Sequence, residues 1–365
     1  MTDILITNAL RRSVESASNG AQTVLFTAKG QPSFVNIIPK FDVSTISTEL
    51  GSGTHPAFIV NGTEVSQIYV GTYPGTIVNG ELLSLPDREA SVNQQYDAWV
   101  TYAKAAGTGW HLMTNAEWSA VAMRSILAGF QPDGNTVYGV SYEDSTQKGR
   151  RSDGLTPGTQ SGTGTTLTGS GPTPWRHDNT MAGISDLAGN IWEAVTGYRI
   201  VAGEIQVMTN NNAAIAGTDH STTSSAWMAI DGSTGLLVTP TFTGSIANSN
   251  YVPTTSNSVR VATSGTTAYT LVVPASGAWT GITNPSSTPV SAAALKTLKQ
   301  LLIIPLTSLT TDDYIFYGSG YEIMPRRGGA FTNNAGGGIF ATVANNGRVA
   351  MSANNSGGRP VYYSS

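Results

Sequence analysis

The sequence predicts an α+β fold, for three reasons. Apolar residues recur at spacings of three and four in some segments, which indicates amphipathic helices. Many other segments are short, alternate between polar and apolar residues, and are bounded by turn formers, which is typical of strands. Glycine is abundant, with 41 in 365 residues, and this length can bury a real core in one large domain or two ordinary ones.

The composition narrows the class of protein. Only 12% of the residues are charged, against roughly a quarter in typical soluble domains, so neutral polar side chains provide the solubility. Many loop-rich extracellular and virion-surface proteins share this composition. The net charge of −4 offers no electrostatic footprint for nucleic acid, and no run of ~20 apolar residues predicts membrane insertion. We therefore expect neither partner.

The sequence lacks cysteine and a secretory signal, and these two features exclude further classes of site and of protein. The chain has no cysteine, which excludes disulfides, thiolate metal sites and cysteine nucleophiles. Its first residues lack the positive start and continuous apolar region of a secretory signal. We expect a protein that reaches the outside by cell lysis or stays in the cytosol.

Residues 1–40 are predicted to form a small N-terminal β element for attachment or oligomerisation. Polar and apolar residues alternate there, as at Ile4 and Ile6, around scattered glycines. The remainder, 41–365, is predicted to be one domain. Near its start, residues 55–75 place apolar side chains between turn formers, as a pair of strands would.

Three helices are predicted in this domain. Apolar residues at helical spacing indicate the first over 92–107 and another over 292–301. Between these two, Thr114 and Glu117 form a T-x-x-E capping box that starts a further helix. Residues 110–112 precede that box as a short extended segment.

Two long segments are poor in apolar residues. Residues 154–174 have too little apolar area to offset the entropy of ordering them, so a mobile excursion is predicted. Their glycines lack the strand-loop-helix context of a phosphate cradle. Residues 199–310 form a Thr/Ser-rich insert of alternating, strand-like segments.

The most distinctive local motif is GISDLAGNIWEAVTG, residues 183–197. Asp186 and Asn190 are turn formers, and they place Trp192 at the start of a buried strand. The last fifty residues, 316–365, differ from the rest of the chain. They are almost free of acidic charge, and three Asn pairs lie between Gly clusters and small residues. This pattern is typical of a displayed surface, although each Asn pair could equally form a simple turn.

Three separated motifs now carry a family resemblance. They are GWHLMTNAEWSAVAMR (109–124), GISDLAGNIWEAVTG (183–197), and PRRGGAF (325–331) with its GGRPVY ending (357–362). In this order they resemble the formylglycine-generating-enzyme, or sulfatase-modifying-factor, type of the C-type lectin fold. The resemblance spans residues 37–362 apart from the insert. It implies capped helices packed on a small twisted sheet, with Trp118, Trp192 and Phe331 in the core.

The chain departs from the catalytic members of that family. The resembled oxidases bind copper through a cysteine pair that this chain lacks, and related sulfoxide-forming enzymes bind iron through clustered histidines. The four histidines here are scattered and form no H-E-x-x-H motif. No G-x-S-x-G elbow predicts a hydrolytic triad. Paired carboxylates for glycoside cleavage stay open, but Asp312, Asp313, Glu143 and Asp144 are typical of solvated turns. We predict no catalytic residue and no required cofactor.

One metal question stays open. Asp186, Asn190 and Glu193 offer oxygen ligands at close spacing, and the resembled enzymes can hold calcium near this motif. A structural calcium ion near Asp186 and Asn190 is one interpretation. A turn closed by Asn and Asp hydrogen bonds is the favoured one.

The same fold, in similar form, is used by variable proteins of diversity-generating retroelements, including phage tropism determinants that bind host receptors. The resemblance implies that 316–365 is a variable-type binding face. Tyr, Ser, Gly and Asn dominate it, as in antibody paratopes, where Tyr supplies contact area and Asn adaptable hydrogen bonds. The implied binding residues are Tyr317, Ser319, Tyr321, Asn333, Asn334, Asn345, Asn346, Arg348, Asn354 and Asn355. The implied framework residues are Gly328, Gly329, Phe331, Ile339 and Phe340.

We therefore expect a non-catalytic phage or prophage tail-tip protein that binds a host cell-surface receptor, either a protein or a saccharide. It is expected to be a homotrimer, docked through its N-terminal region onto other virion tail proteins. Its location would be the virion tail, and it would be extracellular after lysis. Two alternatives remain open: an enzyme of the same fold, either glycan-cleaving or a divergent metal-dependent oxygenase, and a purely structural tail protein.

Overall fold

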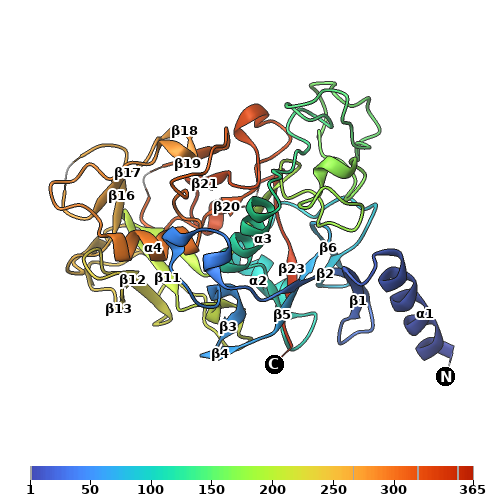
Figure 1. The fold of residues 1–365 in the computed structure, drawn as a ribbon, viewed down its shortest axis with the longest axis horizontal. Helices are drawn as coiled ribbons and strands as arrows, with labels where there is room; N and C mark the ends of the chain where they lie inside the picture. Colours follow the sequence, from blue (N-terminus) through green and yellow to red (C-terminus); the bar gives the residue numbers. More distant parts are fainter. Residues whose placement is uncertain (1, 266, 319, 352, 365) are drawn as a thin grey trace.

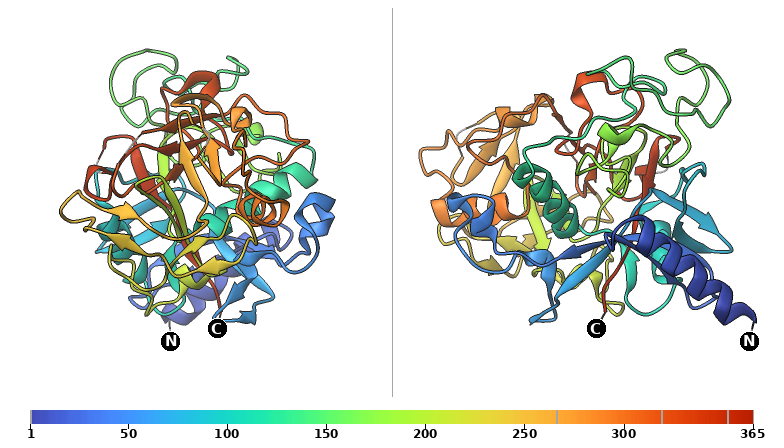
Figure 2. Two further views of the ribbon diagram at one scale, coloured as in Figure 1. Left: turned by 90° about the vertical axis from the view of Figure 1, so that its left-hand side faces the viewer. Right: turned by 45° about the vertical axis from the view of Figure 1, so that its right-hand side comes forward.

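The computed structural model describes residues 2–265, 267–318, 320–351 and 353–364, with side chains from residue 7 onward. It combines helices with sheets, as the predicted α+β class requires. The N-terminal helix projects at one end of the molecule and the insert lies at the other (Figure 1; Figure 2, right). None of the helices within these residues is long and apolar enough to cross a membrane. The α-helices are α1 (Thr2–Ala17), α2 (Tyr96–Lys104), α3 (Asn115–Leu127) and α4 (Ala292–Gln300).

Helix α1 contradicts the all-strand expectation for residues 1–40. Leu10 and Val14 lie about one helical turn apart and are both half-buried, so the period of 3.6 prevails over alternation. The helix stops before Asn19 and Gly20, whose φ angles of 50° and 79° are left-handed. Such a residue pair ends a helix at low cost.

A five-stranded sheet follows directly from α1 and has the order β1-β2-β5-β23-β8. Its strands are β1 (Gln22–Phe26), β2 (Pro32–Pro39), β5 (Gln67–Gly71), β23 (Pro360–Tyr362) and β8 (Trp110–Leu112). Strand β23 comes from the GGRPVY motif and pairs antiparallel with both of its neighbours. The extended segment predicted at 110–112 is therefore confirmed as a strand. The N-terminal strands lie in the same sheet as the C-terminal one.

A six-stranded sheet contains most of the strands of the last fifty residues and has the order β18-β19-β21-β20-β9-β22. Its strands are β18 (Ser276–Ala278), β19 (Tyr314–Tyr317), β21 (Thr342–Ala344), β20 (Arg326–Arg327), β9 (Trp192–Ala194) and β22 (Ser356–Gly358). The strand predicted at Trp192 is confirmed. It pairs with β20 and β22, which come from the two C-terminal motifs.

The insert is rich in strands, as expected, and forms a third sheet of order β13-β12-β11-β16-β17, with β10 also paired to β11. Its strands are β10 (Tyr198–Val201), β11 (Glu204–Met208), β12 (Trp227–Ile230), β13 (Leu237–Val238), β16 (Arg260–Ala262) and β17 (Thr270–Val272). Hairpins complete the strands: β14 (Phe242–Thr243) with β15 (Val252–Pro253), β3 (Ile59–Val60) with β4 (Thr63–Glu64), and β6 (Gly75–Val78) with β7 (Glu81–Ser84).

The helix predictions hold with one correction. The capping box is confirmed, because the Thr114 hydroxyl accepts the N–H of Glu117 at 3.0 Å and the Glu117 carboxylate accepts the N–H of Thr114 at 2.8 Å. Helix α2 begins at Tyr96 rather than at residue 92, and it is shorter than predicted. Asn93, just ahead of it, has a φ angle of 63°, which a right-handed helix cannot contain.

A buried ion pair joins the GNIWE motif to the C-terminal motif. Arg359 Nε lies 2.9 Å and Nη2 lies 2.5 Å from the two carboxylate oxygens of Glu193. The same guanidinium donates to the carbonyls of Gly71 and Ser185, at 2.8 and 2.9 Å. Arg359 and Glu193 are almost entirely buried, so these motif residues hold two sheets together.

Residues 154–174 are more ordered in their packing than the sequence suggests. Thr166 is fully buried, its N–H donates to Asn190 Oδ1 at 2.8 Å, and the Asn190 side chain donates back to its carbonyl at 3.2 Å. The predicted excursion is therefore wrong for residues 164–168. Side-chain hydrogen bonds anchor them in place of apolar area.

Candidate functional site

The last fifty residues combine buried strands with displayed loops. The five predicted framework residues are all buried. Trp118 of α3 donates its indole N–H to the carbonyl of Ile339 at 2.8 Å, and Phe340 stacks on Trp279 with ring centroids 5.7 Å apart. Trp192 and Phe331 are 5% and 6% exposed, which confirms that these aromatics belong to the core.

The RGG motif requires its glycines. Gly328 and Gly329 have φ angles of 94° and 89°, which side-chain-bearing residues rarely adopt. A Cβ atom at Gly329 would lie 2.7 Å from the Cα atom of Gly337, and one at Gly328 would lie 2.8 Å from the carbonyl of Leu187. The motif thus lets its backbone approach those of Leu187 and Gly337 closely.

Two displayed loops leave the same end of the six-stranded sheet. Strands β19 and β21 are parallel, with Tyr317 paired to Ala344. The N–H of Gly318 donates to the carbonyl of Ala344 at 3.0 Å, and the N–H of Met324 donates to that of Asn346 at 3.0 Å. The loop after Tyr317 and the loop after Ala344 therefore lie side by side.

The predicted binding side chains on these loops differ in exposure. Tyr321 is 44% exposed, and Asn345 is exposed as well. Tyr317 is half-buried, and its hydroxyl donates to the carbonyl of Val261 in the insert at 3.3 Å. Ser319 lies outside the described residues. Tyr321 and Asn345 are thus free to contact a partner, whereas Tyr317 partly anchors the loop.

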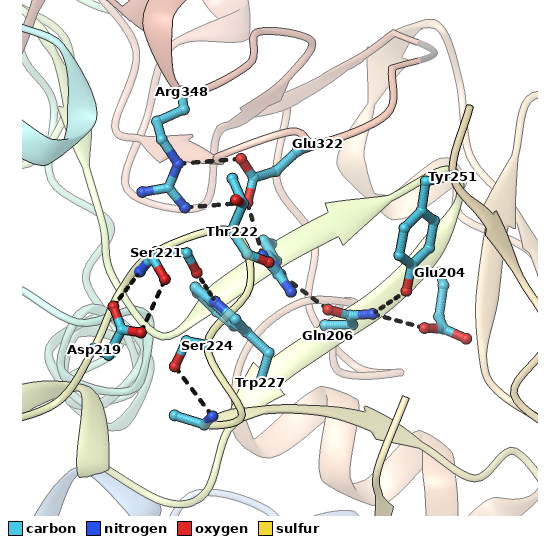
Figure 3. A network of polar contacts seen from close by, with 12 residues as sticks. Glu204, Gln206, Asp219, Ser221, Thr222, Ser224, Trp227, Tyr251, Glu322 and Arg348 are labelled. Carbon is cyan, nitrogen blue, oxygen red and sulfur yellow. Dashed lines mark hydrogen bonds and ion pairs between the residues drawn. The ribbon is translucent and has the colours of Figure 1, made fainter. Parts of the chain in front are cut away.

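Arg348 was predicted to be exposed, and this is wrong, because its side chain is only 10% exposed. Its Nε and Nη2 donate to the Glu322 carboxylate at 3.1 Å each, and Nη1 donates to Asp97 at 2.5 Å. Its guanidinium carbon lies 4.8 Å from the centre of the Tyr96 ring. Burial would lower the pKa of Arg348, but the Glu322 carboxylate outweighs it and the pKa is raised. Arg348 therefore fixes the loop that carries it (Figure 3).

The third loop, which contains Asn354 and Asn355, lies beside the start of helix α2. The N–H of Asn93 donates to the carbonyl of Ala353 at 3.1 Å, and the N–H of Tyr96 donates to that of Arg348 at 3.2 Å. Asn354 is exposed and Asn355 is half-buried. The segment before α2 thus holds two of the displayed loops next to each other.

Arg326 connects the loop that contains Asn346 with Ser356, which follows the third loop. One of its Nη atoms donates to the Ser356 hydroxyl, and the other lies 2.7 Å from the side-chain oxygen of Asn346 when that amide faces it. No carboxylate forms an ion pair with Arg326 among the described residues. Burial lowers the pKa of its guanidinium to about 10.

We call the surface formed by Tyr317, Tyr321, Asn345, Asn346, Arg348, Asn354 and Asn355 the tail face.

Asn333 and Asn334 are not part of the tail face. The N–H of Asn334 donates to the carbonyl of Thr136 at 3.1 Å, and the short 3-10 helix Asn334–Gly336 packs against β19. A Cβ atom at Gly336 would lie 2.9 Å from Tyr314, which begins β19, whereas the tail face begins at its end. Strand β19 has four residues and spans about 10 Å, so the predicted binding residues that the structure describes form two separate groups.

An acidic cleft of about 390 Å³ adjoins the Asn334 turn, and its carboxylates come from Asp133, Glu143, Asp312 and Asp313. Asp313 was predicted to be a solvated turn residue, and this is wrong, because it is 3% exposed. Its carboxylate accepts the N–H of Phe340 at 2.7 Å and the Gln131 amide at 2.9 Å. Burial raises the pKa of Asp313 to about 6, against the lowering effect of the Phe340 N–H.

Two hollows adjoin the tail face. One, of about 550 Å³, is lined by Tyr317, Gly320 and Tyr321 together with residues 202–203 and 261–263. The other, of about 420 Å³, is lined by Arg348, by α2 and by residues 218–222. Residues of the insert line both hollows, so the insert and the tail build this surface together.

The side chains of Asp186 and Asn190, the two residues considered for calcium, accept hydrogen bonds from other parts of the protein. Asn190 Oδ1 accepts the Asn135 amide at 3.1 Å as well as the Thr166 N–H, and Asp186 Oδ2 accepts the N–H of Gly169 at 2.8 Å. Burial raises the pKa of Asp186, and its Oδ1 has no partner within the described ranges. Across those ranges, no group of three or more His, Asp or Glu residues is close enough to hold a metal ion. The hydrogen bonds of the favoured turn are thus present, and a calcium ion near Asp186 and Asn190 stays an untested prediction.

Two of the four histidines, His55 and His111, make buried contacts within the fold. His55 Nδ1 accepts the N–H of Ala57 at 3.2 Å, and its Nε2 lies 2.9 Å from the carbonyl of Gln300. Burial lowers the pKa of His55 to about 3, although the Gln300 carbonyl opposes this. His111 lies 2.7 Å from Glu117 of the capping box. The rings of His55 and His111 therefore serve structural contacts.

The sequence did not predict Glu322 as a functional residue. Besides Arg348, its carboxylate accepts Arg199 Nη1 at 2.8 Å, and Arg199 belongs to the insert. Glu322 is the sole acidic residue in 314–365, whereas that stretch holds four arginines. This imbalance was the available signal that it pairs with an arginine.

No protein-family model matches the chain, and no curated protein sequence matches it either.

Proposed function

We propose that this chain is a non-catalytic host-recognition protein of a phage or prophage tail, and that the tail face binds a cell-surface receptor. The observation that carries the proposal is the division of the last fifty residues into buried framework and displayed loops. Tyr321, Asn345 and Asn354 are exposed, while the framework residues Gly328, Gly329, Phe331, Ile339 and Phe340 are all buried. Binding residues on loops held by a rigid scaffold can change without loss of the core.

The shape of the molecule supports a tail-tip arrangement. Helix α1 projects at the end opposite the insert (Figures 1 and 2), and the insert lines both hollows of the tail face. In this proposal α1 and its sheet dock onto other virion tail proteins as a homotrimer, and the tail face points outward. The protein is then located in the virion tail and is extracellular after lysis.

The motif resemblance supports the same proposal at the level of fold. The C-type lectin-like type, and the likeness to variable proteins of diversity-generating retroelements, both rest on the three motifs. The neighbouring DNA tests the second point. A reverse transcriptase gene beside a near-copy of the segment encoding 316–365 is expected, and sequence variation that avoids the tail face in related phage isolates would contradict it.

Adsorption of phage particles that carry variant chains tests receptor binding. Tyr321→Ala and Asn345→Ala are each expected to lower adsorption to host cells about tenfold, since exposed anchors often contribute this much to binding. Tyr142→Ala is the matched control, because Tyr142 is 55% exposed and lies outside the tail face. Unchanged adsorption in Tyr321→Ala and Asn345→Ala, with the fold retained, would refute the proposal.

The non-catalytic part of the proposal has its own test. Purified protein incubated with host envelope polysaccharide is expected to release no reducing sugars. Elemental analysis of the same preparation is expected to find no stoichiometric copper or iron. Either sugar release or a bound redox metal would favour an enzyme of the same fold.

A further inference from the structure

The insert contains a small pocket next to the hollow that Arg348 and residues 218–222 line. Its volume is about 210 Å³, below the roughly 300–1,000 Å³ of pockets that hold drug-sized ligands. It lies between β11, β12 and the β14–β15 hairpin. The lining residues used below are Arg199, Gln206, Phe242, Tyr251 and a set of hydroxyl side chains.

One wall of the pocket is an exposed aromatic face. Phe242 is 52% exposed, although it is a large apolar side chain on a surface hairpin. Its inner side stacks on Tyr251, with ring centroids 4.5 Å apart and ring planes at 24°. The Phe242 ring is therefore held in place by Tyr251 while much of its surface stays open to a ligand.

The polar floor of the pocket is fixed by a buried network, which Figure 3 shows from close by. Gln206 Oε1 accepts Arg199 Nε at 2.9 Å, so its amide can face only one way. Gln206 Nε2 donates to Glu204 at 2.7 Å and to the Tyr251 hydroxyl at 3.3 Å. Such a satisfied network orients its members before any ligand arrives.

This network leaves two hydrogen-bond donors unused. The Tyr251 oxygen accepts from Gln206, and its own proton has no acceptor among the described residues. Arg199 Nη2 likewise donates to no residue within those ranges, although Nε and Nη1 both do. Around them, hydroxyl groups that can both donate and accept line the pocket. They belong to Thr222, Thr223, Ser224, Ser225, Thr239 and Ser245.

The charge of the pocket favours a neutral ligand. Arg199 is paired with Glu322 at 2.8 Å, and Glu204 lies on the other side of Gln206. The Arg199 guanidinium also lies 4.4 Å from the centre of the Trp227 ring. An anion such as a phosphate would have to compete for this arginine with the Glu322 carboxylate that already pairs with it.

We propose that this pocket binds one unit of a neutral saccharide, such as the terminal or branching ring of a longer glycan. A pyranose ring has a face of C–H groups with partial positive charge, which suits the negative face of Phe242. Its hydroxyl groups accept from Tyr251 and Arg199 and exchange hydrogen bonds with the surrounding Ser and Thr side chains. This assignment does not depend on the proposed role in host recognition.

Ligand-observed NMR of the purified full chain tests the proposal. The probes are glucose, galactose, mannose and N-acetylglucosamine, with adenosine as an aromatic ligand of another class. We expect at least one sugar to bind with a dissociation constant on the order of 1 mM, since a single ring makes few contacts. Phe242→Ala should weaken that binding at least about tenfold, and Phe242→Tyr, which keeps the ring, should retain it.

The control variant is Val252→Ala. Val252 lies on the same hairpin and is 55% exposed, but it pairs with Thr243 and does not line the pocket. It should bind sugar as the wild type does. Tyr321→Ala should also bind sugar normally, so loss of adsorption in that variant would concern the tail face alone.

Three results would overturn the assignment. Absence of binding by all four sugars would exclude a neutral saccharide site. Equal binding by wild type and a folded Phe242→Ala variant would place the sugar elsewhere. Binding of adenosine without any sugar would assign the pocket to a nucleobase-type ligand.

Discussion

Replacing Arg359 by Met removes the guanidinium that holds Glu193 in the core, while keeping a side chain of similar length. Four hydrogen bonds are lost, two to the Glu193 carboxylate and one each to the carbonyls of Gly71 and Ser185. Glu193 is 1% exposed, so water cannot replace the missing partner. The variant therefore leaves a buried charge and two buried carbonyls without their donor.

The expected cost is large. An unpaired buried charge costs about 3–5 kcal/mol, and each lost hydrogen bond to a carbonyl adds about 1 kcal/mol. The sum of about 5–7 kcal/mol is comparable to the whole stability of a typical domain, about 5–15 kcal/mol. Arg359→Met should therefore unfold at a much lower urea concentration than the wild type, or fail to fold at neutral pH.

A second substitution separates charge from packing. Glu193→Met in the Arg359→Met background removes the unpaired carboxylate, so the double variant should regain several kcal/mol, on the order of the 3–5 kcal/mol charge cost. Urea unfolding followed by circular dichroism measures wild type, both single variants and the double variant. If the double variant is no more stable than Arg359→Met, the loss is one of packing and the reasoning is wrong.

The pH dependence of the same variant gives an independent check. Burial raises the pKa of Glu193, and Arg359 opposes this. Without Arg359 the folded-state pKa rises further above the unfolded value of about 4.3. At pH values between the unfolded and the folded pKa of Glu193, the folded state binds more protons than the unfolded state. The stability of the variant therefore falls as pH rises through this range. The cost of Arg359→Met, measured against wild type at each pH, should therefore shrink as pH falls from 7 toward about 4.

Three further predictions concern the scaffold. His55 has a folded pKa of about 3 against about 6.5 when unfolded, so it contributes up to about 5 kcal/mol of stability that is lost as pH falls through this window. His55→Gln should flatten the acid branch of a thermal unfolding profile, and an unchanged slope would exclude His55 as its cause. Gly329→Ala should cost about 2–4 kcal/mol in urea unfolding through its left-handed φ and its contact with Gly337. Gly62→Ala, with a φ of 75° but open space around the Cβ position, should cost only about 1 kcal/mol, and equal costs would contradict the steric argument. Thr114→Ala should lower stability by about 1–2 kcal/mol through loss of the capping box, whereas a change in melting temperature too small to measure would show that the cap is dispensable.

Local features of this fold could be predicted because their partners are close in sequence. Thr114 and Glu117 are three residues apart, and Asn190 and Trp192 belong to one turn and strand. The helix α1 was missed because Ile4 and Ile6 suggested alternation, and a short segment can satisfy two periods at once. The expectation failed where two local patterns competed.

The missed features depend on partners that are distant in sequence. Arg348 bonds to Asp97 across 251 residues, and Arg199 bonds to Glu322 across 123. No local sequence pattern indicates that such a distant partner will bury an arginine. The prediction of a solvated turn failed at Asp313 for the same reason, because its carboxylate is buried and accepts the N–H of Phe340. The exposure of the tail-face side chains was therefore predicted from residue type alone, and the prediction is correct for only some of these residues.

The placement of β22 and β23 has a consequence for biosynthesis. These strands, Ser356–Gly358 and Pro360–Tyr362, complete two different sheets whose other strands are made earlier. During translation the nascent chain therefore exposes unpaired strand edges until residue 362 has left the ribosome. Pairing across such long sequence separations is slow and exposes chains to aggregation. A chain stopped before Ser356 should accumulate as insoluble material, so tags and reporters are better attached ahead of α1 than in place of β22 or β23.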